Sequence, residues 1–88
     1  MPELRLTRRA RTDLEGLPAT VREAVLHTLD SLAADPEGVG KPLVGRLEGL
    51  WSARVGNYRV LYTWEGENVI VRAIRHRAIA YRRRRAGG

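Results

Sequence analysis

The spacing of the apolar residues changes once along the chain, from a helical period to a strand period, and this change constrains the fold most. Before residue 33, apolar residues recur every three or four positions in two stripes: Ala10, Leu14 and Leu17, then Val21, Val25, Leu29 and Leu32. This spacing is typical of amphipathic helices. From Leu47 onward the period is two, which is typical of half-buried strands. The chain therefore predicts two helices followed by a sheet.

Turn residues divide the second half into three strands. The segments 50–55, 58–64 and 69–74 are rich in β-branched and aromatic residues. Gly56 and Asn57 separate the first pair, and a turn around Gly66 separates the second, so tight hairpins join the strands. A short alternating segment, residues 3–7, adds a strand before the helices. The predicted fold is α+β in the order β-α-α-β-β-β, an antiparallel sheet with a two-helix hairpin on one face.

Capping and breaking residues set the predicted limits of these elements. Thr7 is placed to cap the first helix, and Asp35 with Pro36 ends the second. Residues 36–45 hold two prolines and three glycines, so we expect a loop there. A chain of 88 residues has room for one small core. We expect a single domain over residues 1–81 and a short, basic and flexible C-terminal tail over residues 82–88.

The composition excludes several classes of protein. Without cysteine the chain has neither a disulfide framework nor a thiolate metal site. Its two histidines, His27 and His76, are far apart in sequence, and we expect no metal and no other cofactor. No apolar run approaches the roughly 18 residues of a membrane span, and the first ten residues do not resemble a secretory signal. We expect a cytoplasmic protein that does not bind membranes.

The charge gives the first indication of function. The net charge is +6, and the basic residues are arginines except for Lys41. Four arginines form the run from Arg82 to Arg85. One interpretation is a host with GC-rich codons and a solvated tail. The other is a domain that binds a polyanion, either nucleic acid or an acidic protein. Composition alone does not decide between them.

Side-chain alternation predicts which residues the open face of the sheet displays. The apolar side of the first two hairpin strands consists of Trp51, Ala53, Val55, Tyr58, Val60 and Tyr62. Ser52, Arg54 and Arg59 therefore point the other way, and the two arginines lie within reach across a strand pair. The last strand is ambiguous, because its odd and even positions are both apolar. His76, Arg77 and Tyr81 follow it, so the predicted face combines arginines with one histidine and one tyrosine.

Two motifs carry a family resemblance. The segment Gly56-Asn57-Tyr58-Arg59-Val60-Leu61-Tyr62 is followed by His76-Arg77, three residues and Tyr81. With residues 20–23 and 41–43, this order resembles the RelE/ParE superfamily of bacterial toxins, and the RelE-like branch in particular. The resemblance spans nearly the whole chain and implies a toxin held inactive by an antitoxin. RelE-like members enter the ribosomal A site and cut mRNA without a metal, by attack of a 2′-hydroxyl that leaves a cyclic phosphate.

The resemblance also implies roles for individual residues. Arg59 matches the arginine at the scissile phosphate, and Arg77 matches a second arginine that stabilises the phosphate or the leaving group. Tyr81 resembles the terminal tyrosine that stacks on a base or transfers a proton.

Four further residues complete the predicted site. Ser52 and Arg54 stand where the best-known relatives carry lysines, and because arginine keeps its proton, Arg54 supplies only charge. His76 is then the candidate for proton transfer, since histidine titrates near neutral pH. Arg82, beside Tyr81, completes the predicted substrate-binding set with Ser52 and Arg54.

The partners implied are a cognate acidic antitoxin, in a heteromeric complex, and the ribosome with its mRNA. Two other functions stay open from the sequence. One is a ParE-like toxin that inhibits DNA gyrase with no catalytic site. The other is a non-catalytic RNA- or protein-binding relative, which the absence of lysine at positions 52 and 54 supports.

Overall fold

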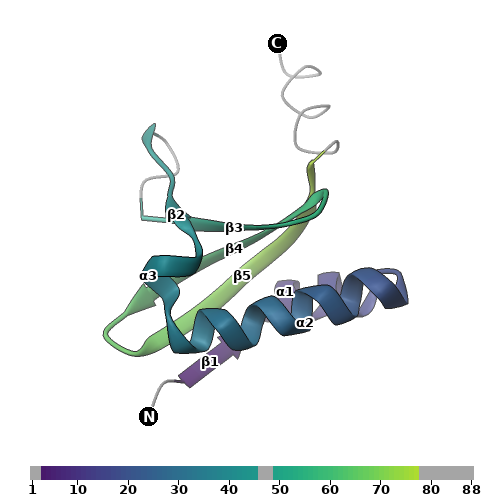
Figure 1. Cartoon of the computed structure of the whole chain (residues 1–88), viewed down its shortest axis with the longest axis horizontal. Helices are drawn as coiled ribbons and strands as arrows, with labels where there is room; N and C mark the ends of the chain where they lie inside the picture. The colour runs from purple at the N-terminus through teal and green to yellow at the C-terminus, as the bar shows by residue number, and fades with distance from the viewer. Residues whose placement is uncertain (1–2, 46–48, 78–88) are drawn as a thin grey trace.

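The computed structural model describes residues 3–45 and 49–77 of the chain (Figure 1). Its elements follow the order β1 (Glu3–Leu6), α1 (Arg8–Glu15), α2 (Ala19–Ala34), α3 (Pro36–Val39), β2 (Lys41–Pro42), β3 (Trp51–Val55), β4 (Tyr58–Glu65) and β5 (Asn68–His76). None of the helices in these ranges is long and apolar enough to cross a membrane. The predicted domain boundary at residues 81 and 82, and the predicted tail, lie outside the described residues.

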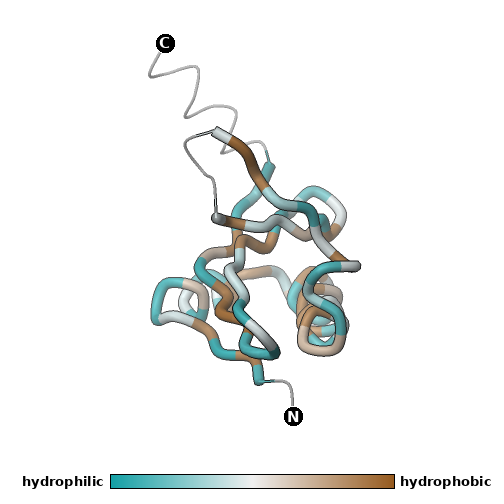
Figure 2. The backbone as a smooth tube through the Cα atoms, turned by 90° about the vertical axis from the view of Figure 1, so that its left-hand side faces the viewer, coloured by the Kyte–Doolittle hydropathy of each residue, from teal (hydrophilic) through white to brown (hydrophobic). Residues whose placement is uncertain are grey.

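The strands form one five-stranded sheet in the order β1-β5-β4-β3-β2. Helices α1 and α2 lie side by side against one face, and Figure 1 shows the other face without a covering helix in the described part of the chain. Figure 2 shows hydrophobic and hydrophilic residues interspersed along the backbone, and in β4 the buried Val60 and Tyr62 alternate with less buried residues, as expected for a sheet with one buried and one open face. The α+β class and the helical hairpin on one face are therefore confirmed.

One strand pair differs from the predicted antiparallel sheet. Strand β1 runs parallel to β5, with Leu4 opposite Val69 and Leu6 opposite Val71. Alternation in a sequence shows which face a strand buries but not which way the strand runs. The tight turns between β3, β4 and β5 require antiparallel pairs, whereas two helices separate β1 from the rest and leave its direction free.

The segment predicted as a loop, residues 36–45, contains two short elements. Asp35 ends α2 and also caps α3, because its Oδ1 accepts a hydrogen bond from the Gly38 N–H at 3.0 Å. Lys41 and Pro42 form β2, which pairs with β3 in antiparallel register. The prediction of a loop was wrong because prolines and glycines are common both in loops and at the ends of short elements. Here a proline begins the single helical turn of α3.

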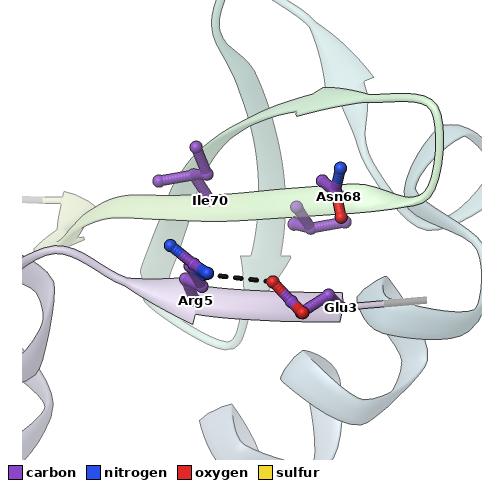
Figure 3. Close-up of a pocket in the computed structure, with 5 residues that line it drawn as sticks. Glu3, Arg5, Asn68 and Ile70 are labelled. Atoms are coloured by element: carbon purple, nitrogen blue, oxygen red, sulfur yellow. Dashed lines mark hydrogen bonds and ion pairs between the residues drawn. The ribbon is translucent and has the colours of Figure 1, made fainter. Parts of the chain in front are cut away.

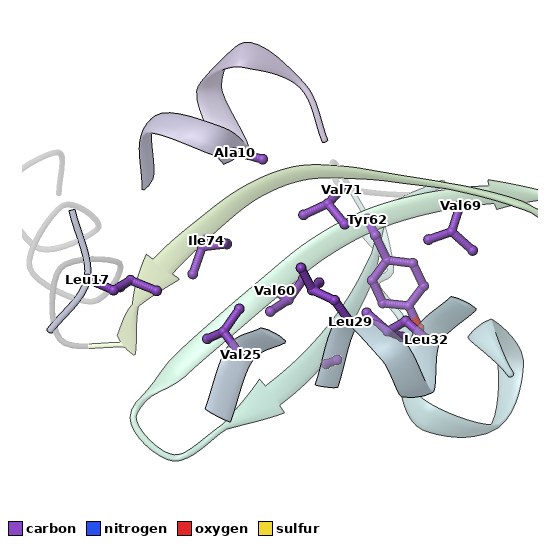
Figure 4. Close-up of a cluster of buried hydrophobic side chains, with 11 residues drawn as sticks. Ala10, Leu17, Val25, Leu29, Leu32, Val60, Tyr62, Val69, Val71 and Ile74 are labelled. Atoms are coloured by element: carbon purple, nitrogen blue, oxygen red, sulfur yellow. The ribbon is translucent and has the colours of Figure 1, made fainter. Parts of the chain in front are cut away.

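Helices α1 and α2 and the central strands contribute to one hydrophobic core (Figure 4). Its fully buried members include Val25 and Leu32 from α2, with Val60 and Tyr62 from β4. The ambiguity of the last strand is resolved by a bulge in β5. Leu61 and Tyr62 are consecutive, yet their partners on β5 are separated by Arg72. The extra residue shifts the alternation, so that the core receives Val69 and Val71 before the bulge and Ile74 after it.

Helix α1 is joined to this bulge by side-chain hydrogen bonds. Thr7 caps the helix as predicted, since its Oγ1 accepts from the Ala10 N–H at 3.1 Å, and the same hydroxyl donates to the Arg72 carbonyl at 3.0 Å. Asp13 accepts a hydrogen bond from the Ile74 N–H at 3.0 Å. Strand β1 pairs with β5 only as far as Val71, so these contacts satisfy backbone groups of β5 beyond the end of β1.

Replacing Asp13 by alanine is expected to lower the free energy of unfolding by about 1–2 kcal/mol, because the partly buried Ile74 N–H loses its acceptor. Urea denaturation measures this change. Asp13→Asn is the matched control, since it keeps an acceptor oxygen at the same place and should cost less. Equal losses in the two variants would show that the carboxylate charge, and not the hydrogen bond, is what matters.

Tyr62 holds the segment of α3 and β2 against the sheet through its hydroxyl group. Its ring is fully buried, and its hydroxyl donates a hydrogen bond of 2.6 Å to the Pro36 carbonyl. Burial raises the pKa of Tyr62 to about 12, against a smaller lowering by a backbone hydrogen bond from Gly40. Gly40 approaches so closely that a Cβ added there would overlap the hydroxyl oxygen. The segment from Pro36 to Lys41 is thus fixed around one phenol group.

An arginine groove on the open face

A row of arginines crosses the open face of the sheet. Arg59 on β4 is the Cα partner of Arg54 on β3 and of Arg75 on β5. Residues paired in this way place their side chains on the same face. Arg54 and Arg59 are exposed, and Arg75 is partly exposed. The predicted proximity of Arg54 and Arg59 is confirmed by this register.

Three of the predicted site residues besides Arg59 reach the same groove. The groove has a volume of about 480 Å³ and lies between the row of arginines and the β2 segment. It is lined by Val39, Lys41, Pro42, Leu43, Ser52, Arg54, Arg59 and Arg77, and we call it the arginine groove. Its volume is in the range of sites that hold small molecules or single building blocks of a polymer.

The arginine groove has an excess of positive charge. Across residues 3–45 and 49–77, no ion pair or side-chain hydrogen bond involves Lys41, Arg54 or Arg59. Like charges on directly opposed strand positions repel one another. An arginine pair without a nearby carboxylate is therefore stabilised by an anion, and the planar guanidinium suits the oxygens of a phosphate.

A second hollow, at the β1 edge of the sheet, has the opposite character. It is lined by Glu3, Arg5, Asn68, Val69 and Ile70 (Figure 3). Here the Arg5 Nε lies 3.1 Å from the Glu3 carboxylate, so the charge is already balanced within the strand. Of these two hollows, the arginine groove has the positive charge without a paired carboxylate, and it is therefore the candidate site.

The structure separates His76 from the groove. His76 is the Cα partner of Tyr58, so its side chain lies on the helix-covered face, opposite that of Arg59. Its ring meets the Tyr58 ring edge-on, with centroids 4.8 Å apart. The sequence left the facing of the last strand open and grouped His76 with the open face; the bulge in β5 instead turns its side chain to the helix side. The predicted residues Tyr81 and Arg82 lie outside the described residues.

Two basic residues near the site were missed by sequence reasoning. Lys41 lines the groove because β2 pairs with β3 and sets Lys41 opposite Ser52. Arg75 completes the arginine row beside Arg59. A two-residue strand in a segment rich in proline and glycine leaves no periodic signal. The signals available for Lys41 are that it is the only lysine of the chain and that residues 41–43 are among the segments that carry the family resemblance.

The part of the chain that the structure describes holds no group of three or more histidine, cysteine or carboxylate side chains able to bind a metal ion. The polar side chains among the lining residues of the groove carry guanidinium, ammonium and hydroxyl groups. Its chemistry is that of a site that binds anions and stabilises negative charge.

Comparison with known proteins gives a consistent result. Residues 4–81 match the family described as the ParE toxin of type II toxin–antitoxin system, parDE. The chain is 42% identical over 83 residues to Toxin RelG of Mycobacterium tuberculosis, a match that covers 91% of this chain and 95% of that protein. It is 38% identical over 80 residues to Toxin RelE of the same organism, covering 88% and 82% of the two chains.

Solved structures show the same fold. The toxin–antitoxin complex RelBE2 from Mycobacterium tuberculosis contains a chain that superimposes with a TM-score of 0.79 at 39% identity, covering 88% of this chain and 92% of that one. A chain of the ParDE system from P. aeruginosa gives 0.69 at 13% identity over 86% and 96% of the two chains, a likeness of fold alone. The family match, the identity to two mycobacterial toxins and the shared fold place this chain in the RelE/ParE superfamily of toxins from type II toxin–antitoxin systems.

Proposed function

We propose that this toxin is a ribosome-dependent endoribonuclease that cleaves mRNA in the ribosomal A site. The observation that carries the proposal is the convergence of Arg54, Arg59 and Arg77 with Ser52 in one groove. A protein that acted only by covering another protein would have no need to gather phosphate-binding groups in a hollow. The identity to RelG and RelE supports the same activity.

The proposed reaction is an internal transesterification of RNA. The 2′-oxygen attacks the adjacent phosphorus, the new 2′-O–P bond forms, and the bond from phosphorus to the 5′-oxygen breaks. The 2′-hydroxyl gives up its proton and the 5′-oxygen gains one, leaving a cyclic phosphate. No metal or other cofactor takes part in this scheme.

The groove residues have distinct roles in this scheme. Arg59, at the centre of the arginine row, binds the scissile phosphate and stabilises the negative charge that grows on it. Arg54 and Arg77 add charge at the leaving group and at the flanking phosphate, and Ser52 donates a hydrogen bond. Guanidinium groups stay protonated at neutral pH and cannot act as bases, so the proton transfers need another group.

Tyr81 is our candidate for base stacking or proton transfer, with Arg82 beside it on the substrate. We assign no proton transfer to His76, because its ring packs against Tyr58 on the face opposite Arg59.

The partner proposed for the free toxin is an acidic antitoxin whose chain covers the arginine groove. Three observations support it: the net charge of +6, the open sheet face, and the toxin–antitoxin complexes among the similar structures. A partner of this kind neutralises the arginine row while it blocks access to RNA. The complex and its ribosomal target would both belong to the cytoplasm.

Inhibition of DNA gyrase is the second candidate. The description of the matched family, a ParE toxin, favours it. The ParDE structure supports the fold only, at 13% identity. The arginine groove has no assigned use in an inhibitor that makes no covalent change, and for that reason we rank the nuclease first.

Induction of the gene in a bacterium, followed by primer extension on abundant transcripts, tests the proposal. A nuclease produces new 5′ ends inside translated regions, and these disappear when translation is blocked before induction. Purified protein added to ribosomes with mRNA in the A site should reproduce them. Growth arrest with intact transcripts and damaged DNA would instead identify gyrase as the target.

A further inference from the structure

We propose that Lys41 is a phosphate-binding residue of the arginine groove, and that the buried Tyr62 positions it from the other face of the sheet. The inference rests on the proposed function, since the phosphate belongs to an RNA strand. It adds a residue from β2 to a site whose other members come from the central hairpin and the end of β5.

The strand register brings Lys41 to the groove. Lys41 is the Cα partner of Ser52, and Ser52 is two positions from Arg54 on the same face of β3. The Lys41 side chain is exposed and lines the groove together with both of them. Lys41 therefore lies on the β2 side of the groove, with Arg54 on the neighbouring strand β3 and Arg59 one strand further, on β4.

The ammonium group differs in kind from its neighbours. A guanidinium presents a rigid planar fork, whereas an ammonium on a flexible stem is a compact charge with three donors. The Lys41 ammonium can therefore bind a phosphate group in more than one position, as different RNA sequences would present it. We infer that Arg59 holds the reacting phosphate and that Lys41 holds a neighbouring one.

Strand β2 is too short to hold Lys41 in place by pairing alone. It has two residues, and one of them, Pro42, has no N–H to donate. After β2, the Leu43 N–H donates a hydrogen bond of 2.8 Å to the Leu50 carbonyl, and before it the preceding residues are fixed by Tyr62. Pro36 accepts the hydrogen bond of 2.6 Å from the Tyr62 hydroxyl, and Gly40, next to Lys41, packs directly on that hydroxyl.

Tyr62 thereby connects the core to the groove. Its ring is fully buried among core residues on the helix side, and its hydroxyl fixes the segment that passes around the sheet edge to β2. Loss of the hydroxyl would leave the core ring in place but release the segment that carries Lys41. Tyr62 is in this sense a positioning residue that acts through Lys41.

Binding of a short single-stranded RNA, measured at several salt concentrations, tests the role of Lys41. Each phosphate contact contributes about −0.7 to the slope of log K against log salt on single strands, so Lys41→Met should flatten the slope by about 0.7. Lys41→Arg should keep most of it. Arg11→Met, which removes one exposed charge from α1, is the matched control and should leave the slope nearly unchanged.

Tyr62→Phe tests the positioning role in a double-mutant cycle with Lys41→Met. The single Tyr62→Phe change should weaken RNA binding severalfold, and it should cause no further loss in the Lys41→Met background. A merely structural role would instead give equal losses in both backgrounds. Near-ultraviolet circular dichroism checks that each variant is folded.

The two proposals fail in different ways. Wild-type protein that shows no salt-dependent RNA binding and no cleavage on ribosomes would reject the nuclease function, and this inference with it. Wild-type protein that binds and cleaves, with Lys41→Met indistinguishable from Arg11→Met, would reject the inference and leave the function standing.

Discussion

Replacing Arg59 by alanine is expected to abolish growth inhibition while the protein stays folded. The side chain is exposed and points away from the core, so its removal should change the free energy of unfolding by no more than about 0.5 kcal/mol. Arg54 and Arg75 flank it on both sides, so its loss also relieves repulsion, and the melting temperature at low salt should not fall. Loss of a charge-stabilising group at the phosphate should slow cleavage by about 100-fold or more.

The matched control is Arg72→Ala. Arg72 is also an exposed arginine of the same sheet, but it lies at the β5 bulge, where it donates a hydrogen bond to Thr63 outside the groove. Growth after induction and single-turnover cleavage on programmed ribosomes measure both variants. A folded Arg59→Ala protein with full toxicity would remove Arg59 from the active site. Equal damage from Arg72→Ala would point to the overall charge and not to the groove.

Gly40→Ala is expected to damage both stability and activity. The backbone at Gly40 is extended (φ −111°, ψ −172°) and suits any residue, so the effect is purely steric. A Cβ there would overlap the Tyr62 hydroxyl and come within 2.9 Å of the Ser52 carbonyl oxygen. Overpacking of this kind costs about 1–3 kcal/mol, and we expect the upper end because a backbone atom is one of the two obstacles.

The functional part of this prediction follows from the position of Gly40 beside Lys41. To make room, the backbone must shift β2 away from β3, which moves Lys41 out of the groove. Gly16→Ala is the control, since a Cβ there meets only ordinary contacts of 3.6 and 3.7 Å. Chemical denaturation and RNA binding report the two effects separately. Unchanged values for Gly40→Ala would mean that the segment is less tightly fixed by Tyr62 than its hydrogen bonds indicate.

Most of the fold follows from local patterns that a single sequence displays. The two helical stripes, the Thr7 cap and the turn at Gly56 all depend on residues close in sequence, and each was predicted correctly. The direction of β1 and the pairing of β2 depend on contacts between distant residues. Such contacts leave no periodic signature, so they become visible only in the folded chain.

The same distinction applies to the site. Arg54 and Arg59 lie at equal distances from a two-residue turn, so counting residues outward from the turn is enough to predict that they are close. His76 lies beyond a bulge, and because one extra residue reverses the alternation, the face of its side chain could not be read from the ambiguous last strand. The place of Lys41 in the groove could not be predicted, because it depends on the pairing of β2, a strand of two residues.

The parallel pairing of β1 with β5 has a consequence for the order in which the chain acquires its structure. The first strand finds its place only beside the last one, and the Thr7 hydroxyl bonds to a carbonyl 65 residues further along. Contacts of such long range form late and slow the folding reaction. During synthesis, α1 and α2 emerge long before β5 exists to complete the surface on which they pack. The groove likewise lacks Arg77 until the end of β5 has been made. Synthesis must therefore pass Arg77 before the groove, which we propose acts on ribosomes, can be complete.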